Sequence, residues 1–284
     1  MQSVVVTGVS TGIGWGIAKV MTGKGFRVFG SVRKQADADR LQAELGESFS
    51  PLIFDVTDAA AVARGAAQVR AALGGARLWG LVNNAGIAVA GPLLETSADE
   101  FRRQLEVNLI APMVVVQAFA PMLGTDPALT GPPGRIVNIS SVGGRVGAPF
   151  LGYYAAAKHG LEGLSESLRR ELMRFGIDVI IVAPGSVVTP MWDKAEQIDL
   201  AAYRNSPYSE IIKRFRDYAI ALGRKGWPPE RLGEVVCEAL TAARPKARYA
   251  PVAGKFQNWI LPRMLPVRVV DRIIARTFAI RPSA

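Results

Sequence analysis

The stretch "VVVTGVSTGIGWG" (residues 4–16) decides the fold of this chain. A short β-branched run leads into a glycine-rich turn and then into residues of helical period. Gly8, Gly12 and Gly14 permit a tight turn and a close approach of the backbone. Amides at the start of the following helix would then face an anion. The stretch predicts a strand–turn–helix unit that holds a pyrophosphate, with a plain turn from strand to helix as the alternative.

Outward from this unit, short apolar runs alternate with longer stretches of helical period. Buried strands are expected at SVVVTG (3–8), FRVFGSV (26–32), SPLIFDV (50–56), LWGLVNN (78–84), GRIVNISS (134–141) and IDVIIVAPG (177–185). Helices are expected over 13–24, 37–45, 58–72, 97–123 and 152–174. This order predicts an α/β fold, a doubly wound parallel sheet of the Rossmann type with helices on both faces. Ligands of such sheets bind beyond the carboxyl ends of the strands.

The chain has 284 residues, which suits one domain of this kind over 1–284. The strand–helix alternation breaks over 190–229, which we interpret as a small helical lobe that leaves the sheet and is not a separate domain. Cys237 is the only cysteine, so no disulfide can form within the chain. No apolar run approaches the roughly 20 residues of a membrane span, and the start of the chain has no features of a secretory signal. These features favour a cytoplasmic protein.

Positive charge is concentrated near the C-terminus. The formal net charge is +10, and the last 41 residues contain nine Lys and Arg against a single acid. The remainder is nearly neutral, which argues against a nucleic-acid surface spread over the fold. Within the extension 254–284, one helical stripe is apolar and another carries arginines at four-residue spacing. Such a basic amphipathic helix can lie on an anionic membrane, on its own domain or on a second subunit.

The end of the second expected strand bears on the choice of nucleotide. An acid there holds the ribose hydroxyls of NAD, whereas an arginine accommodates the 2′-phosphate of NADP. This chain has no acid before Asp37 but supplies Arg33 and Lys34, and the planar guanidinium is the better phosphate partner. The sequence therefore favours NADP(H) over NAD(H), a solvated basic pair being the alternative. Asp55 and Val56 are expected near the adenine, unless Asp55 caps the next helix.

The stretch "YYAAAKHG" (153–160) contains the candidate acid–base group. On a helix, positions four apart differ by roughly 40° and positions five apart by roughly 140°. Lys158 therefore shares a face with Tyr154 and not with Tyr153. A nearby ammonium is expected to lower the phenol pKa from about 10 toward the range useful for acid–base catalysis. In isolation the same pattern would describe a packed tyrosine and a solvated lysine.

Taken together, the motifs resemble those of the short-chain dehydrogenase/reductase family. They are TGVSTGIG (7–14), NNAG (83–86), NISS (138–141), YAAAK (154–158) and PGSVVTP (184–190), in order and at the family's spacing. The resemblance covers the chain to about residue 190. The C-terminal extension is similar, more weakly, to the retinol and hydroxysteroid dehydrogenase branch.

The resemblance implies a catalytic tetrad of Asn108, Ser141, Tyr154 and Lys158. Tyr154 would exchange a proton with the substrate oxygen, and Ser141 would hydrogen-bond that oxygen. Lys158 would bind the nicotinamide ribose, and Asn108 would hold a water that links the lysine to solvent. A buried amide in a bent helix is the alternative for Asn108. The resemblance also implies cofactor contacts at Gly8, Ser10, Thr11, Gly12, Ile13, Gly14, Asn83, Ala85, Gly86, Tyr154, Lys158, Pro184, Gly185, Val187 and Thr189.

The lobe suggests what the substrate is. In this family the segment after PGSVVTP usually covers the substrate, and here it offers Met191, Trp192 and Phe215, unless these only pack the lobe. Such a pocket would suit a lipophilic alcohol or ketone such as a steroid or retinoid. No metal is expected, since His159 is the only histidine, Cys237 is the only cysteine, and no pattern of ligands joins them. The family also implies a homodimer or homotetramer. A non-catalytic NADPH-binding sensor is the alternative function.

Overall fold

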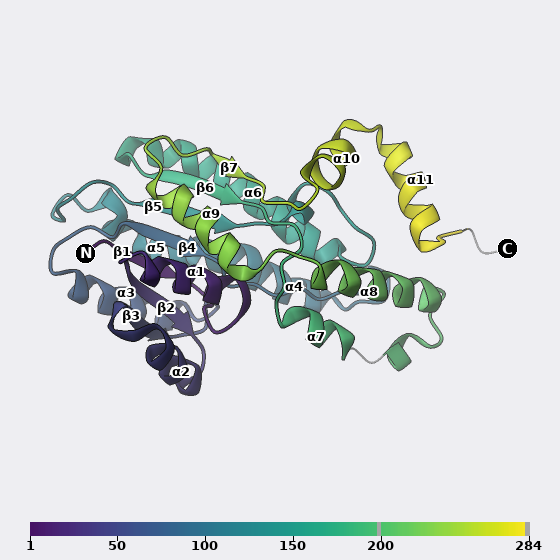
Figure 1. Ribbon diagram of the computed structural model, residues 1–284, viewed down its shortest axis with the longest axis horizontal. Helices are drawn as coiled ribbons and strands as arrows, with labels where there is room; N and C mark the ends of the chain where they lie inside the picture. Colours follow the sequence, from purple (N-terminus) through teal and green to yellow (C-terminus); the bar gives the residue numbers. More distant parts are fainter. Residues whose placement is uncertain (198–199, 282–284) are drawn as a thin grey trace.

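The computed structural model describes residues 1–197 and 200–281. Its centre is one parallel sheet of seven strands in the order β3-β2-β1-β4-β5-β6-β7 (Figure 1). The strands are β1 (Ser3–Val6), β2 (Arg27–Val32), β3 (Phe49–Ile53), β4 (Gly80–Asn83), β5 (Arg135–Ile139), β6 (Asp178–Val182) and β7 (Arg248–Tyr249). The predicted fold class and the six predicted strands are confirmed. The seventh strand was not predicted, because β7 is only two residues long and no apolar run marks it.

The order of the strands reverses between β1 and β4, which are neighbours in the sheet. At such a switch point the loops after the two strands part in opposite directions and leave a crevice at their carboxyl ends. The glycine turn follows β1, so the fold places it at this crevice.

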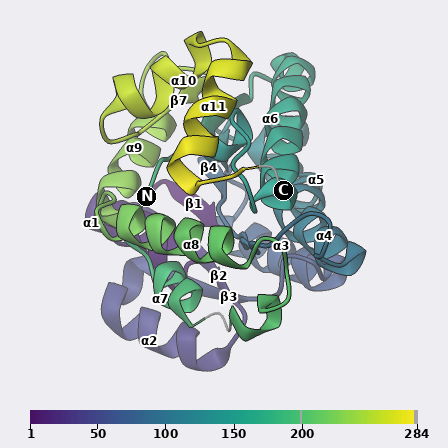
Figure 2. The ribbon, with the colours of Figure 1, turned by 90° about the vertical axis from the view of Figure 1, so that its right-hand side faces the viewer.

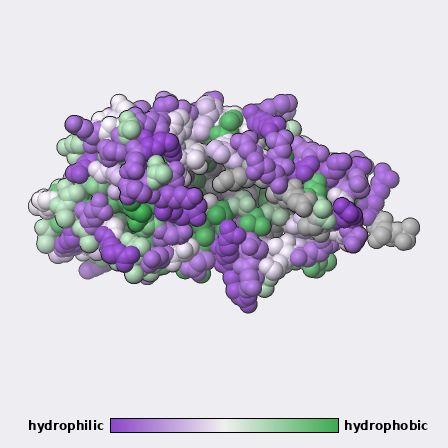
Figure 3. All heavy atoms as spheres, turned by 90° about the horizontal axis from the view of Figure 1, so that it is seen from below, coloured by the Kyte–Doolittle hydropathy of each residue, from purple (hydrophilic) through white to green (hydrophobic). Residues whose placement is uncertain are grey.

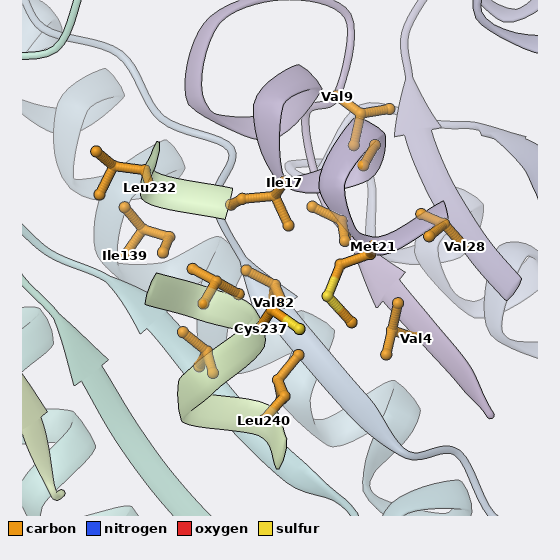
Figure 4. Close-up of a cluster of buried hydrophobic side chains, with 14 of the residues drawn as sticks. Val4, Val9, Ile17, Met21, Val28, Val82, Ile139, Leu232, Cys237 and Leu240 are labelled. Atoms are coloured by element: carbon orange, nitrogen blue, oxygen red, sulfur yellow. The ribbon is translucent and has the colours of Figure 1, made fainter. Parts of the chain in front are cut away.

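Helices cover both faces of the sheet, as the sequence predicts. In chain order they are α1 (Gly12–Gly23), α2 (Gln35–Leu45), α3 (Ala59–Leu73), α4 (Ala98–Leu105), α5 (Ala111–Ala120), α6 (Gly152–Leu172), α7 (Met191–Glu196), α8 (Ser209–Arg224), α9 (Pro229–Thr241), α10 (Leu261–Met264) and α11 (Val267–Phe278). One buried cluster joins α1, α2 and α9 to the sheet, and the other joins α3, α5 and α6. Figure 4 shows the first, in which Met21 of α1 and Leu240 of α9 meet side chains of the strands.

Helix α9 was not predicted, yet it packs closely on α1. A Cβ at Gly16 of α1 would lie 2.5 Å from the carbonyl oxygen of Pro229, at the start of α9. A Cβ at Gly233 of α9 would in turn lie 2.5 Å from the carbonyl oxygen of Gly16. The two backbones touch because neither glycine has a side chain.

One helix of the described chain, running over Ala98–Thr125, is long and apolar enough to cross a membrane by length and composition alone. It comprises α4, a π-helical turn at Glu106–Ile110, α5 and a second π-helical turn. Phe119 and Leu123 are fully buried in the core on the α3 side of the sheet, and Asn108 is buried as well. These contacts are those of a core helix.

The lobe and the extension lie together at one end of the molecule (Figures 1 and 2). Phe278 of α11 packs on Phe215 and Tyr218 of α8, with ring centroids 5.4 Å apart in each pair. Phe215 also meets Phe150, on the loop before α6, at 5.5 Å. Aromatic rings therefore connect the C-terminal helix, through the lobe, to the segment that leads into Tyr154.

Candidate active site

The glycine turn has the conformation that the sequence predicts. Gly8 and Gly12 have φ angles of 69° and 62°, in the left-handed region that favours glycine. The Gly8 amide donates to Ser31 Oγ at 2.9 Å, which fixes the turn to the end of β2. The Asn84 side chain donates to the carbonyl of Gly8 at 3.0 Å. The turn is thus held by the ends of β2 and β4.

The loop after β6 faces this turn and completes a cradle. A Cβ on Gly12 would lie 3.1 Å from Cγ2 of Thr189, so the two segments are in close contact. The Thr189 hydroxyl is buried and has no hydrogen-bond partner within the described residues. Buried hydroxyls normally have a partner. The glycine turn could hold the pyrophosphate of a dinucleotide, and the Thr189 hydroxyl opposite it could bond another part of the same molecule. The other predicted cofactor contacts in this region differ in exposure. Gly14 packs against the turn itself. Buried are Pro184 and Val187, half-buried are Ser10, Ile13 and Gly185, and exposed is Thr11.

Arg33 lies beyond the end of β2, where a 2′-phosphate is expected. Its side chain is 76% exposed, and its guanidinium is 3.8 Å from Asp55. Asp55 accepts from the backbone and the hydroxyl of Thr57 at 3.0 and 2.8 Å. Partial burial raises the pKa of Asp55, but the Thr57 bonds and Arg33 outweigh it, so the net pKa is lowered. Asp58, and not Asp55, caps α3, and Val56 is buried.

Arg40 was not among the predicted site residues. From α2 it reaches back to donate to the Ser10 carbonyl in the glycine turn at 2.6 Å. It also pairs with Glu44 at 3.3 Å, so its charge is already engaged. No local pattern in the sequence distinguishes this contact from an ordinary pair along a helix.

Ser141, Tyr154 and Lys158 come together at the carboxyl edge of the sheet. Ser141 follows β5, and Tyr154 and Lys158 lie on one face of α6. Ser141 hydrogen-bonds Tyr154, and its Oγ accepts from the Gly143 amide at 3.1 Å. Lys158 is buried and donates from Nζ to the Ile139 carbonyl at 2.9 Å, while Nζ lies 5.8 Å from the centroid of the Tyr154 ring.

The expected effect of Lys158 on the tyrosine is not found. Burial raises the pKa of Tyr154 above 10.0, and only the Ser141 hydrogen bond lowers it. The ammonium lies over the ring and bonds a backbone carbonyl, so it does not stabilise the phenolate oxygen. Burial also lowers the pKa of Lys158, to about 8. Burial therefore shifts both side chains toward their neutral forms.

Asn108 is buried in the π-helical turn between α4 and α5. Its side chain donates to the carbonyl of Ile87 at 2.8 Å and accepts from the Ile87 amide at 2.9 Å, which ties the loop after β4 to this helix. A Cβ on Gly86 would lie 2.9 Å from Asn108 Oδ1 and 3.8 Å from Lys158 Nζ. Asn108 and Lys158 thus meet across Gly86. The water that Asn108 is expected to hold between Lys158 and solvent stays a prediction.

Asn83 and Ala85 hold neighbouring strands in place. Asn83 is buried at the end of β4 and donates to Asn138 of β5 at 2.9 Å. The Ala85 amide donates to the hydroxyl of Thr7 at 3.0 Å, beside the glycine turn.

Tyr153 and His159 lie outside this group of side chains. The Tyr153 ring stacks on Phe101 at 4.4 Å, and its hydroxyl donates to the Thr96 carbonyl at 3.0 Å. His159 is exposed and its Nδ1 bonds the Ala155 carbonyl at 2.8 Å. Within 1–197 and 200–281, no three His, Cys, Asp or Glu side chains are grouped to hold a metal.

The predicted substrate residues differ in their surroundings. Met191 is 44% exposed. Trp192 donates from Nε1 to the Val187 carbonyl at 2.7 Å and packs against Gly223 of α8. Phe215 is buried among aromatic rings. Trp192 and Phe215 are thus held in packing contacts, and their role toward a substrate stays a prediction.

Phe150 was not identified from the sequence. It has a φ of 62°, which is unusual for a residue with a bulky side chain. Its ring packs on Tyr208 and Phe215, at centroid distances of 5.9 and 5.5 Å. No sequence pattern marks such a backbone conformation.

This sheet, the glycine turn at its switch point and the Ser141–Tyr154–Lys158 group define a Rossmann-type oxidoreductase that uses NAD or NADP. The chain belongs to the short-chain dehydrogenase family, whose model matches residues 2–199. It is 36% identical over 273 residues to an NADPH-dependent 3-dehydrocapnine reductase of Ornithobacterium rhinotracheale, covering 96% of each chain. It is 34% identical to mouse retinol dehydrogenase 5, covering 95% of this chain and 87% of that one.

A solved structure agrees with this assignment. The crystal structure of a short-chain dehydrogenase from Streptomyces avermitilis is similar with a TM-score of 0.77 and 27% identity, covering 98% of this chain and 97% of the other. The likeness extends over the lobe and the C-terminal extension as well as the sheet.

Proposed function

We propose that this protein is an NADP(H)-dependent oxidoreductase that interconverts a lipophilic alcohol and its carbonyl, with Tyr154 as the general acid and base. The observation that carries the proposal is the group of Ser141, Tyr154 and Lys158, held together beside the cradle formed by the glycine turn and Thr189. A nicotinamide cofactor would supply or accept the hydride when bound.

Each side chain then has a defined task. During reduction, the Tyr154 hydroxyl gives its proton to the carbonyl oxygen as the carbon gains a hydride; during oxidation it takes that proton back. A phenol is protonated at neutral pH, which is the form that reduction needs, and burial favours this form further by raising the pKa of Tyr154. Ser141 Oγ accepts from the Gly143 amide, so its own hydrogen, which otherwise bonds Tyr154, can be donated to the same substrate oxygen.

Lys158 and Thr189 orient the cofactor. Lys158 would hold the nicotinamide ribose through donors not used on the Ile139 carbonyl. Thr189, whose buried hydroxyl has no partner in the described chain, would bond the carboxamide together with the backbone of Val187. A bound ribose would also change the surroundings of the Lys158 ammonium, and with them its effect on Tyr154.

Arg33 supports the choice of NADP(H). Its guanidinium is exposed at the end of β2 and only loosely paired with Asp55, so it is available to a 2′-phosphate. The name of the Ornithobacterium relative, an NADPH-dependent reductase, agrees with this choice.

The substrate class rests on the lobe and on the relatives. Aromatic rings of α8 and the Phe150 loop lie next to the segment that carries Tyr154. Apolar walls with few polar anchors suit a steroid, a retinoid or a similar lipid. A relative named as a retinol dehydrogenase points the same way.

The test measures oxidation and reduction of the nicotinamide with NADP⁺/NADPH and with NAD⁺/NADH, over a panel of lipophilic alcohols and ketones. We expect turnover on a lipid member and a loss of about 10²- to 10⁴-fold in Tyr154→Phe. Tyr153→Phe, a change of the same size on the adjacent residue, is the matched control and should keep most of the activity. Tight NADPH binding without turnover on the whole panel would instead support a sensor.

We also propose peripheral membrane contact through the extension. Phe278 faces the protein, but Phe256, Met264 and Val267 are 62%, 73% and 75% exposed. Each has an exposed basic residue beside it in the sequence, namely Lys255, Arg263 and Arg268. The face in Figure 3 carries mostly polar side chains with apolar patches among them. Sedimentation with anionic vesicles should bring down the wild type and not a triple alanine variant at these positions, with neutral vesicles as control. Equal sedimentation of both proteins would refute the contact.

Finally, we propose a homodimer or homotetramer formed through the long helices Ala98–Thr125 and α6. Ile110 is 47% exposed on the first of these helices. Light scattering would test this, because an Ile110→Arg variant should shift toward monomer while the wild type does not.

A further inference from the structure

Glu162 is a buried carboxylate behind the candidate active site. It lies on α6 one turn beyond Lys158 and two beyond Tyr154, so the three side chains follow one side of the helix. Its side chain is only 3% exposed. An acid is almost never buried to this extent unless it is paired, and the proposed reaction gives Glu162 no part.

Its two carboxylate oxygens hold both ends of the segment that carries Ser141. Oε1 accepts from Ser140 Oγ at 2.8 Å, and Oε2 accepts from Arg145 Nε at 2.6 Å. The residues between them form the tight turn Val142–Gly144. A Cβ on Gly144 would lie 2.7 Å from Oε1, so the carboxylate sits directly against this turn.

A third partner comes from the far end of the chain. Arg248 of β7 donates from Nη1 to Glu162 Oε2. Its Nε and Nη2 are buried and have no acceptor in the described part of the chain. The guanidinium lies 4.9 Å from the ring centroid of Trp259, in the C-terminal extension. Glu162 is therefore the acid that pairs with the partly buried charge of Arg248.

We propose that Glu162 is a positioning residue for Ser141. By holding Ser140 and Arg145 it sets where the Ser141 hydroxyl stands against Tyr154, and Arg248 extends this support to the C-terminal extension. The inference rests on the proposed function, which gives Ser141 its place at the substrate oxygen. A displacement of about 1 Å in a reacting group is enough to cost on the order of 10²-fold in rate.

Hydrogen exchange tests the positioning without any need for turnover. Amides of Gly144, Arg145 and Val146 bond within the segment at 3.0, 3.1 and 3.2 Å, so their exchange reports its opening. In Glu162→Gln we expect exchange there about tenfold faster or more, with the core strands unchanged. Glu171→Gln, an exposed acid on the same helix, is the matched control and should leave the segment as it is. Unchanged exchange in folded Glu162→Gln would overturn the proposal.

A second variant covers a failure of Glu162→Gln to fold. Ser140→Ala removes one hydrogen bond from Glu162 and leaves all charges paired. It should speed exchange over 142–146 by about threefold. If it does not, the proposal is wrong. Because neither readout depends on a substrate, this failure is distinct from an inactive wild type.

Turnover separates positioning from a general loss of stability. Glu162→Gln should lower kcat by about 10- to 100-fold and leave the KM for cofactor within about twofold. In a Ser141→Ala background the same substitution should cost no more than about twofold, since the hydroxyl it positions is gone. If the loss of kcat in the double variant equals the product of the two single losses, Glu162 does not act through Ser141 and the proposal is wrong.

Discussion

Replacing Arg33 by alanine tests the cofactor preference at a residue that the fold itself hardly needs. The side chain is 76% exposed and its ion pair with Asp55 spans 3.8 Å. Exposed pairs of this kind contribute about 0.2–1 kcal/mol, so the free energy of unfolding should scarcely change. A guanidinium–phosphate contact contributes about 1.5–3 kcal/mol. We therefore expect the Kd for NADPH to rise by about 10- to 150-fold.

The assay is titration of cofactor fluorescence with NADPH and with NADH, at low and at high ionic strength. NADH lacks the 2′-phosphate, so its Kd should stay within about twofold of the wild type. The loss for NADPH should be largest at low salt, where screening is weakest. Lys34→Ala, a neighbouring exposed cation, is the control and should cost less. The reasoning is refuted if Arg33→Ala binds NADPH within about twofold of the wild type.

Three further predictions concern stability. Folded Lys158 releases its proton at about pH 8 and the unfolded chain near 10.5, so the unfolded chain binds more protons in this window. In urea unfolding, the free energy of unfolding of the wild type should therefore rise between pH 8 and 10 by on the order of 2 kcal/mol more than that of Lys158→Met. The same pH dependence in both proteins would contradict the lowered pKa of Lys158. Gly16→Ala should destabilise by about 1–3 kcal/mol, because its Cβ would lie 2.5 Å from the Pro229 carbonyl oxygen. Gly23→Ala should not destabilise, because no atom of the described residues lies within 4 Å of its Cβ, and thermal melts compare the two variants. Phe278→Ala should speed hydrogen exchange in α8 and α11 and leave the sheet protected, since the ring packs on Phe215 and Tyr218 of α8. An equal increase of exchange in the sheet would argue against a local role.

Local patterns in the sequence were enough to predict most of the fold. The six longer strands are nearly continuous apolar runs, and parallel strands covered by helices on both faces require such runs. β7 has no such run: it pairs through two residues with β6, and Tyr249 is the one it buries. Helix α9 was missed for another reason. Its packing on α1 depends on glycines in both helices, and glycine lowers helix propensity while permitting close contact.

The side chains at the carboxyl edge were also predictable, because the spacing of Tyr154 and Lys158 on a helix fixes their shared face. Their protonation was not. The expected fall in the tyrosine pKa assumed a charge at the phenol oxygen, but Lys158 bonds the Ile139 carbonyl and burial raises the tyrosine pKa instead. Spacing along a helix gives direction, whereas a pKa depends on which atoms meet and how much water remains around them.

Glu162 shows where reasoning from local sequence ends. Alternation along a strand predicts that Ser140 faces away from Ser141, but nothing local says what it meets there. In "KHGLEGLSESL" the glutamate resembles any acid on a helix, and Arg248 stands 86 positions further along the chain. Only the fold brings the two together, since β7 pairs with β6 beside the face that α6 covers. Removing the charge of Glu162 leaves the guanidinium of Arg248, whose side chain is 21% exposed, without its acid, at a cost of up to about 3–5 kcal/mol. Glu162, which no sequence pattern identifies, is therefore the residue on which we expect the position of Ser141 to depend most.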